Sequence, residues 1–262
     1  MAEPLFQALA LTLYPEMFPG PLGQSLAGKA LRGGIWSLET LQIRDFATDK
    51  HKTVDASPYG GGSGMVLKPD VVDAAVCAAK ARLPGARVLY PSPRGRLLTQ
   101  EFAEEMKNQK LIFVCGRFEG LDERVIAHHQ MLEFSLGDFV LSGGEIAALA
   151  LMDACVRLLP GVMGKEDSAQ HESFSLAVET HEKQAKTGKA SQNAQSPQES
   201  EKFAGLLEYP HYTRPPIWNG LSVPDILLSG DHEKIKRWRL EQAKNTTRAR
   251  RPDLVKKKDE RP

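Results

Sequence analysis

The chain of 262 residues lacks the features that mark several protein classes. Its three cysteines, Cys77, Cys115 and Cys155, lie far apart and form no C-x-x-C pair, which excludes a disulfide framework and a structural zinc site. No apolar run approaches the roughly 18 residues that a membrane-spanning helix needs. No basic residue precedes the apolar segment 5–14, as a secretory signal would require. We therefore expect a soluble, cytoplasmic protein with reduced cysteines and no membrane partner.

Two nucleotide-binding fingerprints are missing as well. No G-x-G-x-x-G sequence stands between a first strand and a helix, and this excludes a dinucleotide-dependent oxidoreductase. The glycine cluster at 59–64 (YGGGSG) lacks the Gly-Lys-Ser/Thr ending of a phosphate-binding loop. Composition alone favours a flexible surface turn for this cluster.

The net charge of +1 is small, but it is unevenly distributed. Residues 232–262 contain 12 lysines and arginines against 5 acidic residues, so the rest of the chain must carry −6 to reach that total. A basic terminus on a mildly acidic body suggests a polyanionic partner, and a solvated helix with a frayed tail explains the charge equally well. A hydrophobic content of 41% is sufficient for a real core.

Short apolar runs alternate with helical segments along the first part of the chain. This alternation predicts an α/β fold whose parallel sheet is covered by helices on both faces. Several of the runs end in glycine-bearing turns, and ligands bind at such turns in parallel sheets. Residues 91–96 (PSPRGR) are expected to form a stiff basic loop. Strands are predicted at 5–14, 38–43, 87–90, 111–115, 131–136 and 139–141, and helices at 69–83, 99–107 and 146–159.

A change of composition divides the chain. Residues 179–202 contain no valine, isoleucine, leucine, methionine or aromatic residue, so they cannot bury enough apolar surface to offset their ordering entropy. This predicts a disordered linker at 175–204 between a first domain, 1–174, and a small, mainly helical, basic domain, 205–262. In the second domain a helix is expected to begin at 229–231, and Trp238 is favoured as a core residue over a base-stacking platform.

Several sequence strings, taken together, resemble one family. VCGRFEGLDERV (114–125), EFSLGDFVLSGGE (133–145) and ALALMDACVRLLPGVMG (148–164) are similar to segments of the bacterial tRNA (guanine-N1)-methyltransferases. This family belongs to the SPOUT class of S-adenosylmethionine-dependent enzymes. TLYPEMF, RDFATDKHKTVD, YGGGSGM, GLLEYPHYTRP and LLSGDHEKIKRWR extend the likeness over nearly the whole chain apart from one insertion. The resemblance implies a deep trefoil knot near 88–160, which no sequence pattern indicates.

The resemblance also implies a reaction. The family transfers a methyl group from S-adenosylmethionine to N1 of guanosine 37 of tRNA, beside the anticodon, which maintains the reading frame. N1 carries a hydrogen, so the reaction needs a general base, and the charge that moves onto O6 needs a cation or strong donor. The guanine must also leave the stack of neighbouring nucleobases before its N1 can be reached. The expected partners are tRNA, not DNA, and a second copy of the chain that completes the active site. Magnesium dependence is associated with the family, and no metal cage is legible here.

The family's site residues match positions in this chain. Arg157 matches an essential arginine, although an arginine reaching the surface from the last turn of a helix explains it from the sequence alone. Glu172, directly before Ser-Phe, matches the carboxylate, usually aspartate, that the family places there. Because of the insertion, Glu199 and Glu201 remain alternative candidates for the general base. Glu172 could also be an ordinary solvated glutamate of the linker without a catalytic role. The resemblance places Glu119 near the guanine or the methionine end of the donor and Ser168 near the substrate. It also places the glycine cluster at 59–64 beside the active site, which favours a functional role for that cluster. The expected cofactor-binding residues are Pro93, Gly95, Gly116, Leu136, Gly137, Asp138, Phe139, Val140, Leu141, Gly143 and Gly144.

Two other functions stay open from the sequence. A non-catalytic RNA-binding protein could share the fold and the basic terminus, but it would not need Arg157, the linker carboxylate and the glycine turns together. A knotted methyltransferase with a different RNA target is the closest rival, because the target is recognised by surfaces that the sequence does not show.

Overall fold

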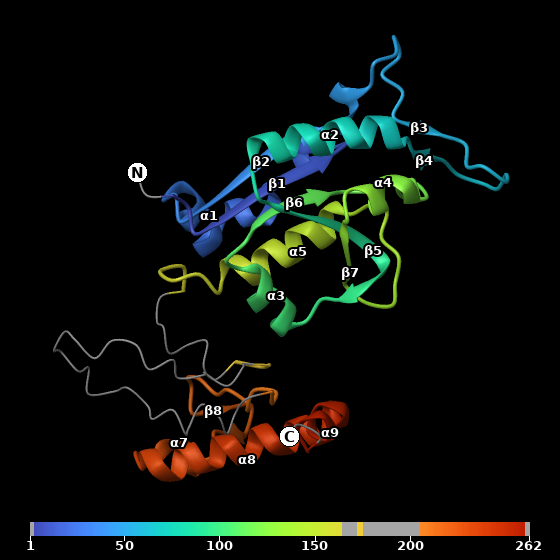
Figure 1. The fold of residues 1–262 in the computed structure, drawn as a ribbon. Helices are drawn as coiled ribbons and strands as arrows, with labels where there is room; N and C mark the ends of the chain where they lie inside the picture. The colour runs from blue at the N-terminus through green and yellow to red at the C-terminus, as the bar shows by residue number, and fades with distance from the viewer. Residues whose placement is uncertain (1–2, 164–171, 175–204, 260–262) are drawn as a thin grey trace. The chain divides into compact units, whose positions relative to one another are not determined.

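The structure, a computed structural model, describes residues 3–163, 172–174 and 205–259 (Figure 1). The chain divides into two compact units, Met1–Gly164 and Lys165–Pro262. The predicted linker at 175–204 and the candidate substrate residue Ser168 lie outside the described residues. No helix in the described ranges is long and apolar enough to cross a membrane.

The first unit contains a five-stranded sheet in which every neighbouring pair of strands is parallel. This confirms the predicted α/β class with a parallel sheet. The strand order is β2-β1-β6-β5-β7. The strands are β1 (Phe6–Thr12), β2 (Trp36–Gln42), β5 (Arg87–Leu97), β6 (Lys110–Val114) and β7 (Leu132–Ser135).

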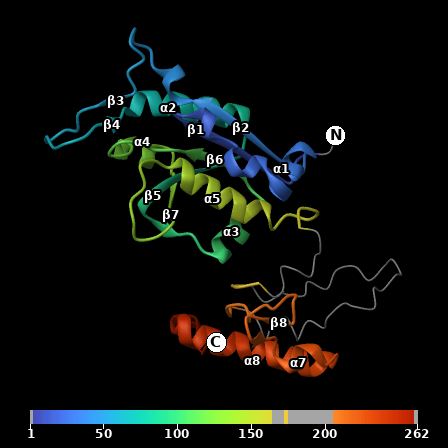
Figure 2. The same ribbon diagram turned by 180° about the vertical axis from the view of Figure 1, so that it is seen from behind.

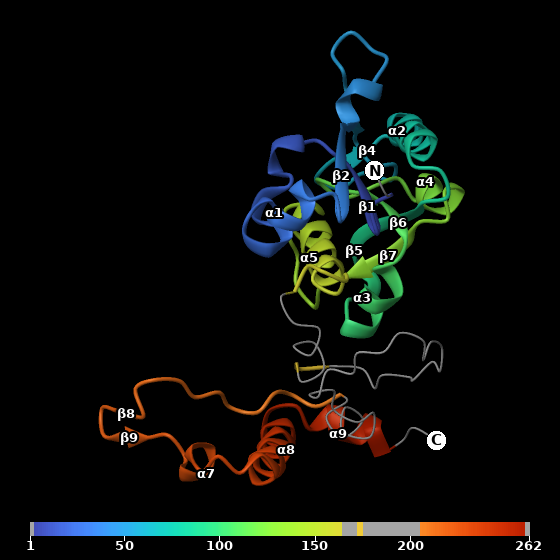
Figure 3. The ribbon, with the colours of Figure 1, turned by 90° about the vertical axis from the view of Figure 1, so that its left-hand side faces the viewer.

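Helices cover both faces of this sheet. Phe6 and Ala8 of β1 belong to one hydrophobic cluster and Leu9 and Leu11 to the other, because successive side chains of a strand point to opposite faces. A strand buried on both faces therefore reads as a continuous apolar run. In Figure 3 α2 and α4 lie on one side of the strands and α1 and α5 on the other, and Figure 2 shows the unit from behind. The helices are α1 (Ser25–Arg32), α2 (Pro69–Arg82), α3 (Gln100–Met106), α4 (Glu123–His128) and α5 (Glu145–Val156).

Short elements complete both units. A two-stranded antiparallel sheet of β3 and β4 precedes α2, and another, of β8 and β9, precedes α7 in the second unit. The short elements of the first unit are β3 (Asp55–Ala56), β4 (Val66–Leu67) and the 3-10 helices η1 (Pro15–Met17), η2 (Gly20–Gly23) and η3 (Ile43–Phe46). The second unit has β8 (Ile217–Trp218), β9 (Leu221–Ser222), α7 (Asp225–Leu228), α8 (His232–Arg250) and α9 (Pro252–Asp259).

Polar side chains begin three of the helices. Thr99 Oγ1 accepts a hydrogen bond from Phe102 N at 3.2 Å, as the sequence predicts for the start of α3. Asp231 accepts from the backbone N–H of Lys234 at 3.0 Å, which confirms the predicted start of α8. Asp122 caps α4 in a similar way. Local sequence therefore determines where these helices begin.

Two predicted segments are wrong. Residues 139–141 are not a strand: Phe139 N donates to Gly137 O at 2.9 Å in a turn, and the side chains face a cavity instead of a neighbouring strand. The expected loop at 91–96 belongs to β5, which continues to Leu97. Pro91 and Arg96 both pair with Phe134 of β7, so the residues between them bulge out of the ladder.

Candidate active site

A cavity of about 280 Å³ opens in the first unit, beside the middle of β5 and the carboxyl ends of β6 and β7. Its wall combines residues 90–93 of β5, where that strand has passed its pairing with β6, the turn after β6 (116–120), and the chain from the end of β7 into α5. The carboxyl edge of a parallel sheet is the usual place for a ligand. The predicted site residues that line the cavity are Pro93, Gly116, Glu119, Leu136, Phe139, Val140, Leu141, Gly143 and Gly144.

The remaining predicted cofactor residues, Gly95, Gly137 and Asp138, are not in the cavity lining. Gly95 lies in the β5 bulge, where a Cβ atom would overlap the backbone of Phe134, so only glycine allows the strands to approach. Gly137 N donates to Ser135 Oγ at 3.1 Å in the turn after β7. Asp138 follows Gly137 and is exposed.

Apolar side chains of the lining are left uncovered. Phe139 is 54% exposed and Val140 is 83% exposed, although both face the cavity. The glycine turns behind them are tied together, since Gly144 N donates to Gly116 O at 3.0 Å. A cavity with uncovered apolar groups and approachable backbone suits a flat ligand with polar edges.

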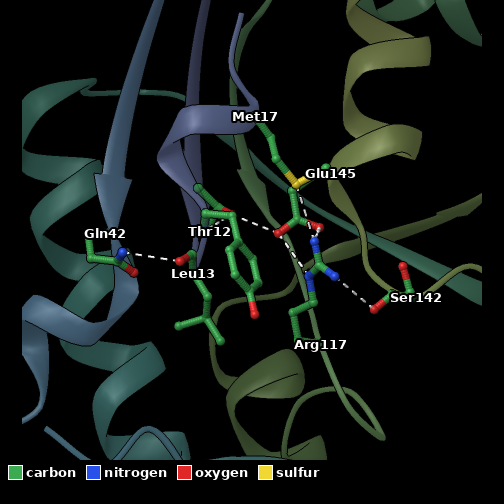
Figure 4. A network of polar contacts seen from close by, with 8 residues as sticks. Thr12, Leu13, Met17, Gln42, Arg117, Ser142 and Glu145 are labelled. Carbon is green, nitrogen blue, oxygen red and sulfur yellow. Dashed lines mark hydrogen bonds and ion pairs between the residues drawn. The ribbon is translucent and has the colours of Figure 1, made fainter. Parts of the chain in front are cut away.

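Arg117, which lines the cavity, forms an ion pair with the buried Glu145 (Figure 4). Glu145, the first residue of α5, is fully buried. Arg117 Nε donates to its Oε1 at 3.2 Å, and Arg117 Nη2 lies 3.0 Å from Oε2. Thr12 Oγ1, at the end of β1, donates to Oε1 at 2.7 Å. The pair therefore joins the turn after β6 to the start of α5 and the end of β1.

Arg117 has further partners around its guanidinium. Nη1 donates to Ser142 O at 3.2 Å, and the group stacks over the Tyr14 ring at 4.5 Å. Sequence reasoning missed Arg117 and Glu145 as site residues. The signal was an acidic residue that opens an otherwise apolar helix directly after two glycines, because such a carboxylate needs a cationic partner.

Two other ionisable groups of this region are held in their neutral forms. Burial, and then the negative charge of Glu145, raise the pKa of the Cys115 thiol well above its ordinary value. Burial likewise raises the pKa of the Tyr90 phenol. Neither group is therefore suited to act as a base or nucleophile at neutral pH.

The glycine cluster at 59–64 has one end near the cavity. Tyr59 is 98% exposed, as expected for a surface turn. At the other end a Cβ atom on Gly64 would overlap the side chain of Glu119, and Glu119 N donates to Met65 O at 2.9 Å. The cluster thus supports the turn that carries Glu119.

Arg157 lies at the opposite end of α5 from the cavity. It is half-buried and follows the last residue of the helix, where its N–H donates to Asp153 O at 3.1 Å. With a rise of 1.5 Å per residue, it lies about 18 Å along the helix from Glu145. The single chain therefore does not bring Arg157 to the cavity of its own first unit.

Glu172 belongs to a short segment anchored in the second unit. Phe174 N donates to Leu206 O at 3.0 Å, and Glu208 N donates to Ser173 Oγ at 3.0 Å. Glu172 itself is half-buried. The residues on the two sides of the insertion therefore lie next to each other, because the Glu-Ser-Phe segment is hydrogen-bonded to residues 206–208.

One cluster in the described part of the chain has the composition of a metal site: Asp73, His128 and His129. His129 Nδ1 lies 3.1 Å from Lys80 Nζ, and His129 Nε2 lies 2.9 Å from Asp73 Oδ1. The ammonium donates to Nδ1, so Nε2 carries the proton and donates to the carboxylate. Both ring nitrogens are thereby used, which favours a structural contact between α2 and α4 over a metal ligand.

Comparison with known proteins gives one consistent result. A profile described as tRNA (Guanine-1)-methyltransferase TrmD matches residues 6–187 and 185–257. A Novosphingobium aromaticivorans protein is 52% identical over 250 residues, which are 95% of this chain and 90% of that protein. A Rhodospirillum rubrum protein is 50% identical, with 95% and 92% covered, and a Rhizobium johnstonii protein is 52% identical, with 96% and 92% covered. Each relative is named tRNA (guanine-N(1)-)-methyltransferase.

Proposed function

The chain belongs to the tRNA (guanine-1)-methyltransferase family, and on that premise we propose that it methylates N1 of guanosine 37 of tRNA with S-adenosylmethionine as donor. The observation that carries the proposal is the cavity beside residues 90–93 of β5 and the carboxyl ends of β6 and β7. It combines glycine turns with uncovered apolar side chains at the position where this fold class binds ligands.

The cavity fits the donor. Phe139 and Val140 offer apolar surface to an adenine ring, and the turns at 116–120 and 142–144 offer backbone donors and acceptors to its edge and to the ribose. S-adenosylmethionine supplies an electrophilic methyl group on a sulfonium. The ion pair of Arg117 and Glu145 fixes the two glycine turns relative to each other, so that both can contact the donor. We place the trefoil knot of the family in this same region, near 88–160.

A homodimer explains the position of Arg157. This arginine lies about 18 Å along α5 from the cavity end of the helix, so one chain alone does not unite the two. In the proposed dimer the cavity of one subunit faces Arg157 and the Glu172 segment of the other. The basic second unit then binds tRNA beside it, since residues 232–262 carry 12 basic against 5 acidic residues.

The residues divide the chemistry between them. Glu172 accepts the proton from guanine N1, whose lone pair then attacks the methyl carbon; the N1–CH3 bond forms as the S–CH3 bond breaks, and S-adenosylhomocysteine leaves with the electron pair on sulfur. Arg157 stabilises the negative charge that moves onto O6 of the guanine. Glu119 and Ser168 hold the guanine ring in place. The anchoring of Ser173 and Phe174 against 206–208 supports Glu172 over Glu199 and Glu201, because it places Glu-Ser-Phe directly beside the second unit.

One experiment tests the proposal as a whole. The protein is incubated with S-adenosylmethionine tritiated in its methyl group and bulk tRNA, and the labelled nucleoside is identified after digestion. We expect N1-methylguanosine, and no label in a transcript with adenosine at position 37. Label in another nucleoside would point to a different RNA target. The absence of S-adenosylmethionine binding in calorimetry would favour a non-catalytic RNA-binding protein.

A further inference from the structure

The second unit has a cavity of its own, which shares no lining residue with the cavity of the first unit. It measures about 480 Å³, within the usual range for small-molecule sites. It lies between the extended segment 209–216, α7 and α8. Rings of Tyr209, His211, Tyr212 and Trp238 line it, together with the cations Arg214 and Arg239.

The rings of this aromatic pocket form two pairs, one of which lies against Arg239. The guanidinium of Arg239 lies over the Tyr209 ring at 5.0 Å, and the Tyr209 and His211 rings are 4.9 Å apart. In the second pair, the Tyr212 and Trp238 rings are 6.3 Å apart. Trp238 is half-buried and lines the cavity, so the prediction that it is only a core residue is incomplete.

Arg239 leaves a donor unsatisfied. Its Nε is buried and has no hydrogen-bond acceptor among the residues that the structure describes. Burying a donor without an acceptor is costly. No carboxylate lines the pocket, and Glu208, which lies 4.0 Å from His211 Nε2, is outside its lining. The positive charge of Arg214 and Arg239 is therefore not balanced by any carboxylate of the lining.

The composition of the pocket indicates the class of that ligand. Aromatic faces stack on nucleobases, and arginine donates to phosphate oxygens and base edges. We propose that the aromatic pocket binds one unstacked nucleotide of the tRNA, with its base against the rings and its acceptor oxygens near the guanidinium groups of Arg214 and Arg239. The inference rests on the proposed function for its substrate, and it adds a nucleotide contact on residues that do not line the first-unit cavity.

The test compares variants of the full-length protein in tRNA methylation. Arg239→Met keeps the apolar stem and removes the donors, and Tyr212→Ala removes a ring that is 48% exposed. We expect each to raise the KM for tRNA about tenfold, in line with the loss of one stacked base, with a much smaller change in kcat. Arg237→Met, at an exposed position of α8 outside the pocket, is the matched control. Its KM should rise about threefold or less, through lost phosphate attraction alone.

A direct readout keeps the inference falsifiable. Ultraviolet cross-linking of bound tRNA, followed by peptide mass spectrometry, should place the adduct on Tyr209, Tyr212 or Trp238. Circular dichroism and thermal denaturation of each full-length variant verify that the second unit is still folded. KM values equal to that of Arg237→Met, together with cross-links that all lie elsewhere, would overturn the inference. The inference would also be overturned if the pocket variants sedimented as monomers, because the pocket would then be a contact between subunits and not a site for tRNA. Failure of the proposed function is a separate outcome, because the wild-type protein would then form no N1-methylguanosine.

Discussion

The carboxylate of Glu145 has no exposure to water and depends on Arg117 and Thr12 for its partners. Glu145→Gln keeps the shape and removes the charge, so the half-buried guanidinium of Arg117 loses its counterion. We expect the free energy of unfolding to fall by about 3–5 kcal/mol, the usual effect of breaking a buried pair. S-adenosylmethionine should also bind more weakly, because the glycine turns lose their tie. Urea denaturation and calorimetry measure the two effects.

A matched control separates burial from charge. Glu39 pairs with Arg82 at the surface, where the two side chains are 48% and 53% exposed. Glu39→Gln should cost less than about 1 kcal/mol and leave cofactor binding unchanged. If both variants unfold at the same urea concentration, the pair at Glu145 has no special role in stability.

Glu172 is the candidate general base, and Glu172→Gln retains its size without the ability to accept a proton. We expect the single-turnover rate of tRNA methylation to fall by about 10²–10⁴, the usual contribution of a general base. Cofactor affinity should hardly change, because the cavity is formed entirely by the first unit.

The linker glutamates Glu199 and Glu201 provide the controls for that experiment. Their glutamine variants should retain wild-type speed. If either of these variants loses its methylation rate while Glu172→Gln keeps wild-type speed, the general base is the residue on the far side of the insertion and not Glu172. Three fast variants would reject a linker carboxylate as the base.

At the scale of elements, His129 connects two helices. It follows α4 and is buried against α2, where it contacts Asp73 and Lys80, and its ring lies 4.9 Å from that of His128. Desolvation lowers the pKa of His129 below its ordinary 6.5, and the positive charge of Lys80 acts in the same direction against the opposing Asp73. The neutral ring is thus the form that packs between the helices.

This arrangement predicts a pH dependence of stability. Because the pKa is lower in the folded state, the unfolded chain takes up the proton first as the pH falls. The free energy of unfolding should therefore decrease from about pH 6.5 down to the folded pKa, and this group should have no effect above pH 6.5. Denaturant titrations from pH 5 to 8 measure the slope, which should be smaller in His129→Gln. An identical slope in the variant would assign the dependence to other groups.

At the scale of the whole molecule, the insertion is expected to be dispensable. Phe174 and Leu206 are hydrogen-bonded across it, so a short connection can close the gap. A deletion of 179–202 should retain the thermal midpoint within a few degrees and most of the tRNA methylation activity. A large loss of either would show that these residues contribute contacts of their own.

Removal of 205–262 should have the opposite effect. The truncated chain keeps the cavity and should bind S-adenosylmethionine with nearly unchanged affinity. It loses the basic residues for tRNA and the 206–208 segment that anchors Ser173 and Phe174, so tRNA methylation should be abolished. Calorimetry and the tritium assay measure both properties, and full activity without 205–262 would contradict the assignment of tRNA binding to the second unit.

The amino-acid sequence determined the features that depend on local patterns. Continuous apolar runs predicted strands buried on both faces, and β1 and β6 confirm them, because side chains alternate across a sheet that has helices on each side. The capping residues Thr99 and Asp231 begin their helices as expected. The combined sequence strings were sufficient for the family, since each reflects backbone turns and packing that few other residues satisfy.

Only the tertiary structure decided features that depend on contacts between distant segments. A three-residue apolar run has no periodicity, so 139–141 could be recognised as cavity lining only once its neighbours were in place. Arg117 and Glu145 are 28 residues apart, and their pairing follows from the order of strands, which places β6 beside β1 and the start of α5 next to both. The contact of Phe174 with Leu206, and the pocket around Trp238, likewise arise from pairings that local backbone preferences do not encode.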